Sequence, residues 1–92
     1  MIAPGAIPRH AERIAARVVD GKALVVVLDD HHLHTLNEVG TRVWELCDGR
    51  NVRDIAHAVA REFDVETDTA LGDVQRFVTE LRDRGALLVE AA

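Results

Sequence analysis

The chain has 92 residues, of which 48% are hydrophobic and 29% are charged, and its formal net charge at pH 7 is −5. This length predicts one domain that buries about 60–65% of its surface on folding, and it disfavours a large internal active-site cavity. The composition is typical of a folded globular chain and excludes a disordered one. The negative charge disfavours a nucleic-acid partner, because DNA- and RNA-binding proteins normally carry a basic surface.

The cysteine content and the N-terminal sequence indicate the cellular compartment of the protein. The single cysteine, Cys47, excludes an intramolecular disulfide and fits a reducing compartment. Residues 1–8 lack the cationic segment and the apolar run of a signal peptide. The longest apolar run, residues 23–28, is too short to span a bilayer. We therefore expect a cytoplasmic protein with no membrane partner.

Residues 1–36 carry the pattern of short strands after an irregular start. Residues 1–12 contain both prolines and little periodicity, which predicts a tail or loosely docked arm. Residues 13–36 are expected to form a three-stranded antiparallel β-meander. Its first turn is Asp20-Gly21, since Asp-Gly between two apolar runs favours a type I′ turn. The expected strands cover 14–19, 22–28 and 32–36.

Helical periodicity follows over residues 37–90. Asn37 and Asn51 are good N-caps, because their side chains can accept a hydrogen bond from a free N–H of the first turn. Gly49 and Gly85 are expected to end the first and third helices. The apolar stripes of the first two helices are Val39, Val43, Leu46 and Cys47, and Val52, Ile55, Ala56, Val59 and Phe63.

The third helix is expected to begin at Thr67 or Asp68. Residues 86–89 form a short apolar segment after it, which is either a further strand or a tail packed on the helices. Strands and helices are segregated along the chain, which predicts the α+β class. The expected architecture is a three-stranded antiparallel β-meander followed by a three-helix winged-helix-like unit.

The histidines and the cysteine are the candidates for metal-binding or catalytic chemistry. His32 and His34 would share one face of a strand and could chelate a metal, with His31 beside them. A closed zinc site needs four ligands, and no further ligand has suitable spacing. Cys47 lies on an apolar stripe and is expected to be a buried small hydrophobe. We therefore predict no metal, no cofactor, no catalytic residue and no enzymatic activity.

The third helix has the position of a DNA-recognition helix in helix-turn-helix proteins. Between Asp68 and Arg84 it carries three arginines and four acidic residues, and a net charge of −1 repels phosphate. A winged-helix DNA-binding regulator or adaptor is therefore the alternative function rather than the preferred one.

Two features are compatible with peptide binding. The margin of the third helix carries Asp73, Phe77, Glu80 and Arg84 at i, i+4, i+7 and i+11, so Phe77 is either a half-buried core residue or the wall of a groove. In a meander, one outer strand keeps its N–H and C=O groups free. That edge is either protected or accepts another extended chain by β-augmentation. It could also pair with a second copy, so a monomer and an edge-strand or domain-swapped dimer both stay open.

From Leu36 to Leu88 the chain resembles the PqqD-like family, the small proteins named for pyrroloquinoline quinone synthesis. Several short motifs carry the resemblance through their joint order and spacing. They are Leu36-Asn37, Trp44-Glu45-Leu46-Cys47-Asp48-Gly49, Val52 with Ile55, Asp73-Val74, Phe77-Val78, Leu81, Gly85 and Leu87-Leu88. Gly40 and Val43-Trp44 depart from the quinone-pathway members, which implies a relative that serves another peptide pathway.

The resemblance implies a RiPP recognition element, a non-catalytic peptide chaperone. Such a domain binds the leader of a ribosomally made precursor peptide by strand addition and presents it to a modifying enzyme, often a radical SAM protein. The implied peptide-binding residues are His32, Leu33, His34, Thr35 and Leu36 on the third strand, and Asp73, Phe77, Glu80 and Arg84 on the third helix.

Overall fold

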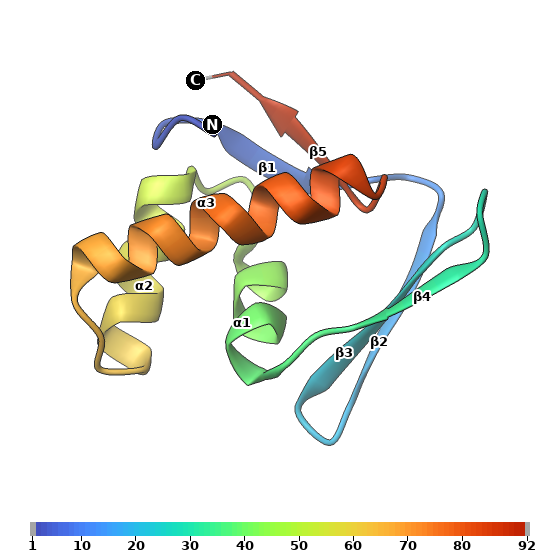
Figure 1. The fold of residues 1–92 in the computed structure, drawn as a ribbon, viewed down its shortest axis with the longest axis horizontal. Helices are drawn as coiled ribbons and strands as arrows, with labels where there is room; N and C mark the ends of the chain where they lie inside the picture. Colours follow the sequence, from blue (N-terminus) through green and yellow to red (C-terminus); the bar gives the residue numbers. More distant parts are fainter. Residues whose placement is uncertain (1, 92) are drawn as a thin grey trace.

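The computed structural model describes residues 2–91, which form five strands and three helices (Figure 1). β2, β3 and β4 form an antiparallel sheet in that order, and β1 pairs with β5 in a separate two-stranded ribbon. The predicted α+β class is therefore confirmed. The elements are β1 (Ile7–His10), β2 (Ile14–Val19), β3 (Lys22–Val27), β4 (His32–Thr35), α1 (Glu38–Leu46), α2 (Val52–Glu62), α3 (Thr67–Asp83) and β5 (Leu87–Glu90).

The β2–β3 hairpin has the predicted turn. Asp20 and Gly21 adopt φ angles of 53° and 77°, as a type I′ turn requires. The following turn into β4 contains His31 at φ 59°, and the Asp30 carboxylate accepts a hydrogen bond from the His32 N–H at 3.0 Å. Local turn chemistry thus sets the register of the three strands.

The N-terminal segment is more ordered than the tail or loosely docked arm expected for residues 1–12. Residue 1 lies outside the described residues, but residues 7–10 form β1 and pair antiparallel with β5. The Ala6 and Pro4 carbonyls accept hydrogen bonds from the first-turn N–H groups of Val52 and Arg53 at 2.9 and 2.8 Å. The expectation of a loosely docked arm is therefore wrong. β1 pairs with β5 and the preceding residues bond to α2, and both partners are distant in sequence.

The helix boundaries follow the predicted caps. The Asn37 side chain accepts from the Gly40 N–H at 2.7 Å, and the Asn51 side chain accepts from the Asp54 N–H at 2.8 Å. α3 begins at Thr67, one of the two predicted starts, without a side-chain cap. Within residues 2–91, none of these helices is both long enough and apolar enough to cross a bilayer.

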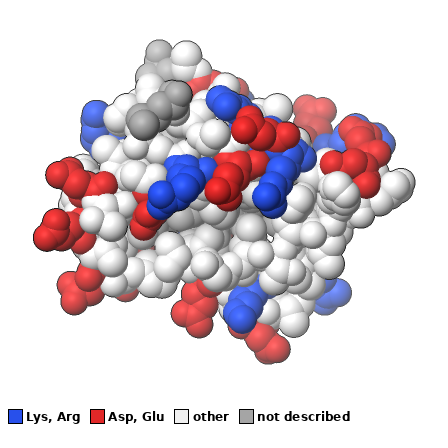
Figure 2. All heavy atoms as spheres, viewed as in Figure 1, with Lys and Arg blue, Asp and Glu red and all other residues white. Residues whose placement is uncertain are grey.

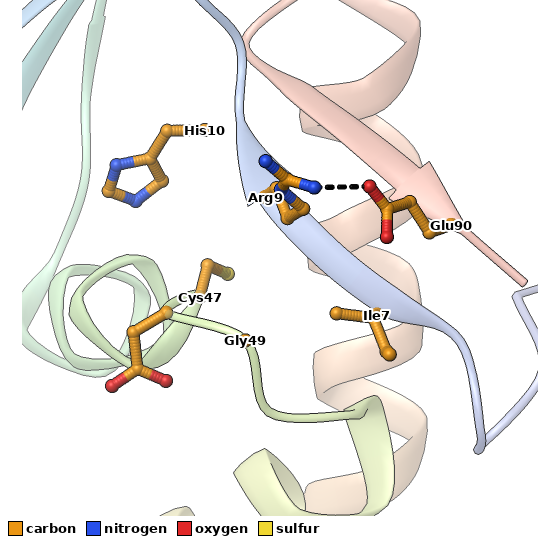
Figure 3. Close-up of a pocket in the computed structure, with 7 residues that line it drawn as sticks. Ile7, Arg9, His10, Cys47, Gly49 and Glu90 are labelled. Carbon is orange, nitrogen blue, oxygen red and sulfur yellow. Dashed lines mark hydrogen bonds and ion pairs between the residues drawn. The ribbon is translucent and has the colours of Figure 1, made fainter. Parts of the chain in front are cut away.

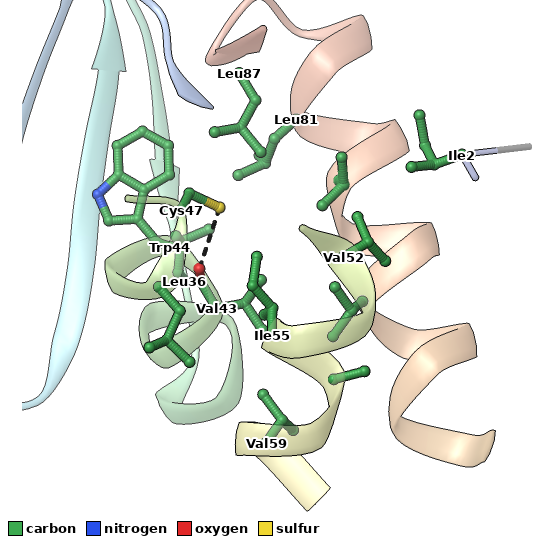
Figure 4. Close-up of a cluster of buried hydrophobic side chains, with 14 of the residues drawn as sticks. Ile2, Leu36, Val43, Trp44, Cys47, Val52, Ile55, Val59, Leu81 and Leu87 are labelled. Atoms are coloured by element: carbon green, nitrogen blue, oxygen red, sulfur yellow. Dashed lines mark hydrogen bonds between the residues drawn. The ribbon is translucent and has the colours of Figure 1, made fainter. Parts of the chain in front are cut away.

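The core lies where the three helices meet the inner face of the sheet (Figure 4). α1 packs on β3, α2 packs on α3, and α3 packs on β5. Cys47 is buried here, as predicted, and its thiol donates to the Val43 carbonyl at 3.2 Å. Burial, with a smaller effect from the Asp48 charge, raises the pKa of the Cys47 thiol to about 12. At neutral pH the group is therefore a protonated thiol.

Candidate functional site

β4 is an edge strand of the three-stranded sheet. The Leu36 N–H, just beyond the strand, donates to the Ala23 carbonyl at 2.8 Å. Bonded and non-bonded pairs alternate along an antiparallel ladder, so the backbone groups of Leu33 and Thr35 point away from β3. No strand within residues 2–91 pairs with this side of β4. The edge therefore offers two N–H donors and two carbonyl acceptors to another chain.

Thr41 of α1 fixes the end of β4. Its buried hydroxyl accepts a hydrogen bond from the Ala23 N–H at 2.7 Å and donates to the Leu36 carbonyl at 3.3 Å. The hydroxyl stands where a second direct bond between Ala23 and Leu36 would continue the ladder. It thus ties α1 to the edge strand. Thr41 was not among the predicted site residues.

A groove of about 340 Å³, called here the β4 groove, separates β4 from α3. It brings together all of the predicted site residues except His32 and Asp73. Its lining comprises Leu33, His34, Thr35, Leu36, Asn37, Gly40, Phe77, Glu80, Leu81 and Arg84. His32 is exposed at the start of β4, and its ring lies 3.7 Å from the Asp30 carboxylate.

A second hollow of about 300 Å³ lies between α1, α2 and α3, and Asp73 stands at it. We call it the valine chamber, because four valines line it. Its full lining is Asn37, Val39, Gly40, Val43, Val59, Asp73, Val74 and Phe77. Phe77 is half-buried, packs against the core, and borders both hollows, so the two readings of this residue are compatible.

Charged side chains of both signs lie along α3, beside the β4 groove and the valine chamber. The Arg84 guanidinium lies 3.4 Å from His34 Nδ1 across the β4 groove, and Asp73 forms an ion pair with Arg76. His34 Nε2 is inaccessible to solvent and has no hydrogen-bond partner within residues 2–91. Figure 2 shows acidic and basic side chains alternating over α3. The surface area directly below this row in the view contains no charged side chains.

A larger hollow of about 470 Å³ lies between β1, the end of α1 and β5 (Figure 3). Arg9 and Glu90 form an ion pair across its rim, and the His10 ring stacks on Trp44 with 3.7 Å between centroids. Cys47 also lines it, but the raised pKa of its thiol makes it a poor nucleophile. At this hollow Cys47 is therefore a buried packing residue rather than an activated nucleophile.

The histidine-rich turn does not assemble a metal centre within residues 2–91, where no three His, Cys, Asp or Glu side chains gather suitably. The His32 and His34 rings lie edge to face with centroids 6.2 Å apart. His34 instead turns toward Arg84 in the β4 groove.

The fold is shared with solved structures of low sequence identity. TbiB1 in complex with the TbiA(beta) leader peptide is similar with a TM-score of 0.83 and 22% identity, over 91% of this chain and 99% of that one. A lasso peptide synthetase B1 complexed with the leader peptide gives 0.81 and 23%, over 89% and 98%. The PqqD truncation of Methylobacterium extorquens PqqCD, described as a stand-alone RiPP recognition element, gives 0.79 and 19%, over 96% and 95%.

Sequence comparison identifies the family. A comparison with curated proteins gave no match. The family described as coenzyme PQQ synthesis protein D (PqqD) matches residues 24–87, which is more than half of the chain and includes most of β3, all of β4 and the three helices. The residues that carried the resemblance and the observed fold agree with this match, and the chain belongs to the PqqD family.

Proposed function

We propose that this domain binds the leader segment of a ribosomally made precursor peptide by adding it as a strand to β4. The domain then presents the peptide to a modifying enzyme, such as a radical SAM protein, and catalyses no reaction itself. The observation that carries the proposal is the free edge of β4 at Leu33 and Thr35, beside a groove walled by α3.

Strand addition uses what this edge offers. Main-chain hydrogen bonds to Leu33 and Thr35 would supply affinity without regard to sequence, and alternate side chains of the peptide would enter the β4 groove. Arg84 and Glu80 at the groove provide cationic and anionic partners that can select among peptides. Ordering a flexible leader lowers the net affinity.

Similar folds support the proposal. Two of the similar structures, TbiB1 and a lasso peptide synthetase B1, are complexes with leader peptides. A third, from Methylobacterium extorquens, is described as a functional stand-alone recognition element. Membership of the PqqD family adds a link to coenzyme PQQ synthesis.

Replacing Thr35 with Pro tests the edge directly. The outward N–H of Thr35 is lost, so binding of a peptide selected from a displayed library of short random peptides should weaken by about 2- to 10-fold. Isothermal titration calorimetry measures the affinity. The matched control is Ala16→Pro, because the Ala16 N–H points away from the sheet at the opposite edge, on β2.

Equal losses in Thr35→Pro and Ala16→Pro would contradict strand addition at β4, as would unchanged affinity in Thr35→Pro. Circular dichroism confirms that both variants are folded. A titration with duplex DNA distinguishes peptide binding from the alternative function. Salt-dependent DNA binding would favour a winged-helix regulator.

A further inference from the structure

The three-stranded sheet has an apolar surface on the side that faces away from its core. Side chains alternate between the two faces along a strand, and Ala23, Val25 and Val27 of β3 are buried in the core. The residues between them, together with their strand partners, form the opposite surface, called here the outer sheet face. It comprises Ala15, Arg17 and Val19 of β2, Lys22, Leu24 and Val26 of β3, Leu28 just beyond β3, and Leu33 and Thr35 of β4.

Large apolar side chains of the outer sheet face are open to solvent. Leu33 is 58% exposed, Val19 43% and Leu28 41%. Leu24 and Val26 lie between them on the central strand and are partly exposed, so the apolar surface is continuous across all three strands. Continuous exposed apolar surface of this kind is typical of a protein interface.

The two ends of the outer sheet face carry opposite net charges. The end at the β2–β3 hairpin has two cations and one acid, and the end at the β3–β4 turn has one cation and two acids. These residues are Arg17, Lys22 and Asp20 at the hairpin, and Arg13, Asp29 and Asp30 at the other end. Since each residue of a strand adds about 3.3 Å, the two ends lie about 20 Å apart.

A second copy of this chain has the complementary arrangement of charges. A two-fold axis in the plane between two outer sheet faces, perpendicular to β3, packs the faces together with their strands antiparallel. The hairpin end of each copy then lies over the opposite end of the other copy, so unlike net charges meet twice. A two-fold axis parallel to β3 would instead bring ends of like charge together.

We infer that the outer sheet face pairs two copies of this chain in the antiparallel, face-to-face arrangement, with Leu24 and Val26 at its centre. Two sheets packed in this way lie about 10 Å apart and within about 30° of alignment. The outward backbone groups of Leu33 and Thr35 lie at the side of the sheet and stay free. Each copy therefore keeps its β4 edge, and the inference does not depend on the proposed function.

The size of the face indicates a weak dimer. Three strands that lie about 4.8 Å apart and run for about 20 Å give a projected area of about 300 Å² per copy. A standard stable interface buries about 800 Å² from each partner. The dimer should therefore form in the micromolar to millimolar range of protein concentration rather than at nanomolar concentrations.

Sedimentation-velocity ultracentrifugation tests the inference, with protein from about 10 µM to about 1 mM. The mean mass of the wild type should rise with concentration toward that of a dimer. Val26→Lys places an unpaired charge at the centre of the interface and should weaken dimerisation by about 10-fold or more. Leu33→Lys should also weaken it, and keeps the test valid if Val26→Lys does not fold. The matched control is Leu88→Lys in β5, which should dimerise as the wild type does, because Leu88 is 55% exposed but lies outside this face.

A charge exchange tests the antiparallel orientation. Lys22→Glu gives the hairpin end the same net sign as the other end. It should weaken dimerisation by about 3-fold or more, because two-fold symmetry repeats each contact. Adding Asp29→Lys restores opposite signs at the two ends and should recover the lost affinity.

Several results would overturn the inference. They are a monomer mass at every concentration, equal losses in Leu33→Lys and Leu88→Lys, and a charge-exchanged double variant that dimerises no better than Lys22→Glu. Dimerisation that Thr35→Pro abolishes and Val26→Lys leaves intact would place the contact at the β4 edge and would also overturn it. These results concern the outer sheet face alone, because the peptide titration with Thr35→Pro decides the proposed function separately.

Discussion

Thr41 shows how one side chain can position a binding edge. Its hydroxyl is buried between the Ala23 N–H and the Leu36 carbonyl, which joins α1 to β3 and to the end of β4. Ala23 is 0% exposed, so water cannot replace this hydrogen bond. A buried donor left without a partner is costly, and the hydroxyl therefore contributes to the stability of the edge.

We expect Thr41→Val to lower the free energy of unfolding by about 1–3 kcal/mol, because the shape is kept but the Ala23 N–H loses its acceptor. Urea denaturation followed by circular dichroism measures the change. Thr41→Ser, which keeps the hydroxyl, is the control and should lose less. A Thr41→Val variant as stable as the wild type would show that the hydrogen bonds of the Thr41 hydroxyl contribute nothing to stability.

Residue-scale prediction succeeded where the signal was local. Asn37 and Asn51 were predicted as caps because their side chains act on the N–H groups of the next turn. Thr41 was missed since its partners lie on other elements, and an isolated threonine in a helix carries no such signal.

At the scale of elements, α1 and α2 are joined by a bidentate ion pair. Arg42 donates from Nε and Nη2 to the two carboxylate oxygens of Glu62 at 2.7 and 3.2 Å. The hydrogen bond from Arg42 lowers the pKa of Glu62 below its ordinary value of 4.5. Both side chains are more than a third exposed, so the effect on stability is small and is screened by salt.

The pKa shift of Glu62 determines how the contribution of this ion pair to stability depends on pH. A carboxylate whose pKa is lowered by folding stabilises the protein above its unfolded pKa, and this stabilisation is lost as the pH falls through the folded pKa. We expect Glu62→Gln to be less stable than the wild type at pH 7, with the difference vanishing at acid pH below the lowered pKa. Thermal unfolding over this pH range measures it. A difference that grows on acidification would contradict this assignment.

Element prediction from periodicity was accurate for the meander and the helices, because each pattern repeats within a few residues. The row on α3 and the short strand at 32–36 were each predicted from such a pattern, but it was the resemblance to the PqqD-like family that implied that the two face each other, as most of their residues do around the β4 groove. His32 falls outside the groove because it starts the strand, and Asp73 falls in the valine chamber because α3 extends past α1.

At the scale of the whole molecule, the two ends of the fold close on each other through β1 and β5. Local periodicity could not reveal this pairing, since Pro8 lies within β1 and its strand partner is Val89. Ile2 and Pro8 are buried, and the segment also satisfies the first turn of α2. The N-terminal segment is thus part of the structure that holds α2 and α3 in place.

Deleting residues 1–10 should lower the free energy of unfolding by about 3 kcal/mol or more, because the Ile2 side chain is lost and the buried Val52 N–H is left unpaired. The melting temperature should fall by about 10 °C or more. Hydrogen exchange should show lost protection at 87–90. The control is Arg9→Ala, which removes only the exposed ion pair and should cost at most about 1 kcal/mol. Unchanged protection at 87–90 would contradict the role given to β1.

The central claim, that an extended peptide pairs with the free edge of β4, is tested most directly by an amide-shift NMR titration. The probe is a peptide selected on the domain from a displayed library, isotopically unlabelled. We predict the largest amide shifts and new exchange protection at Leu33 and Thr35, with further shifts along α3 from Phe77 to Arg84. Shifts confined to β2 or to the β1–β5 ribbon, with Leu33 and Thr35 unchanged, would contradict the account.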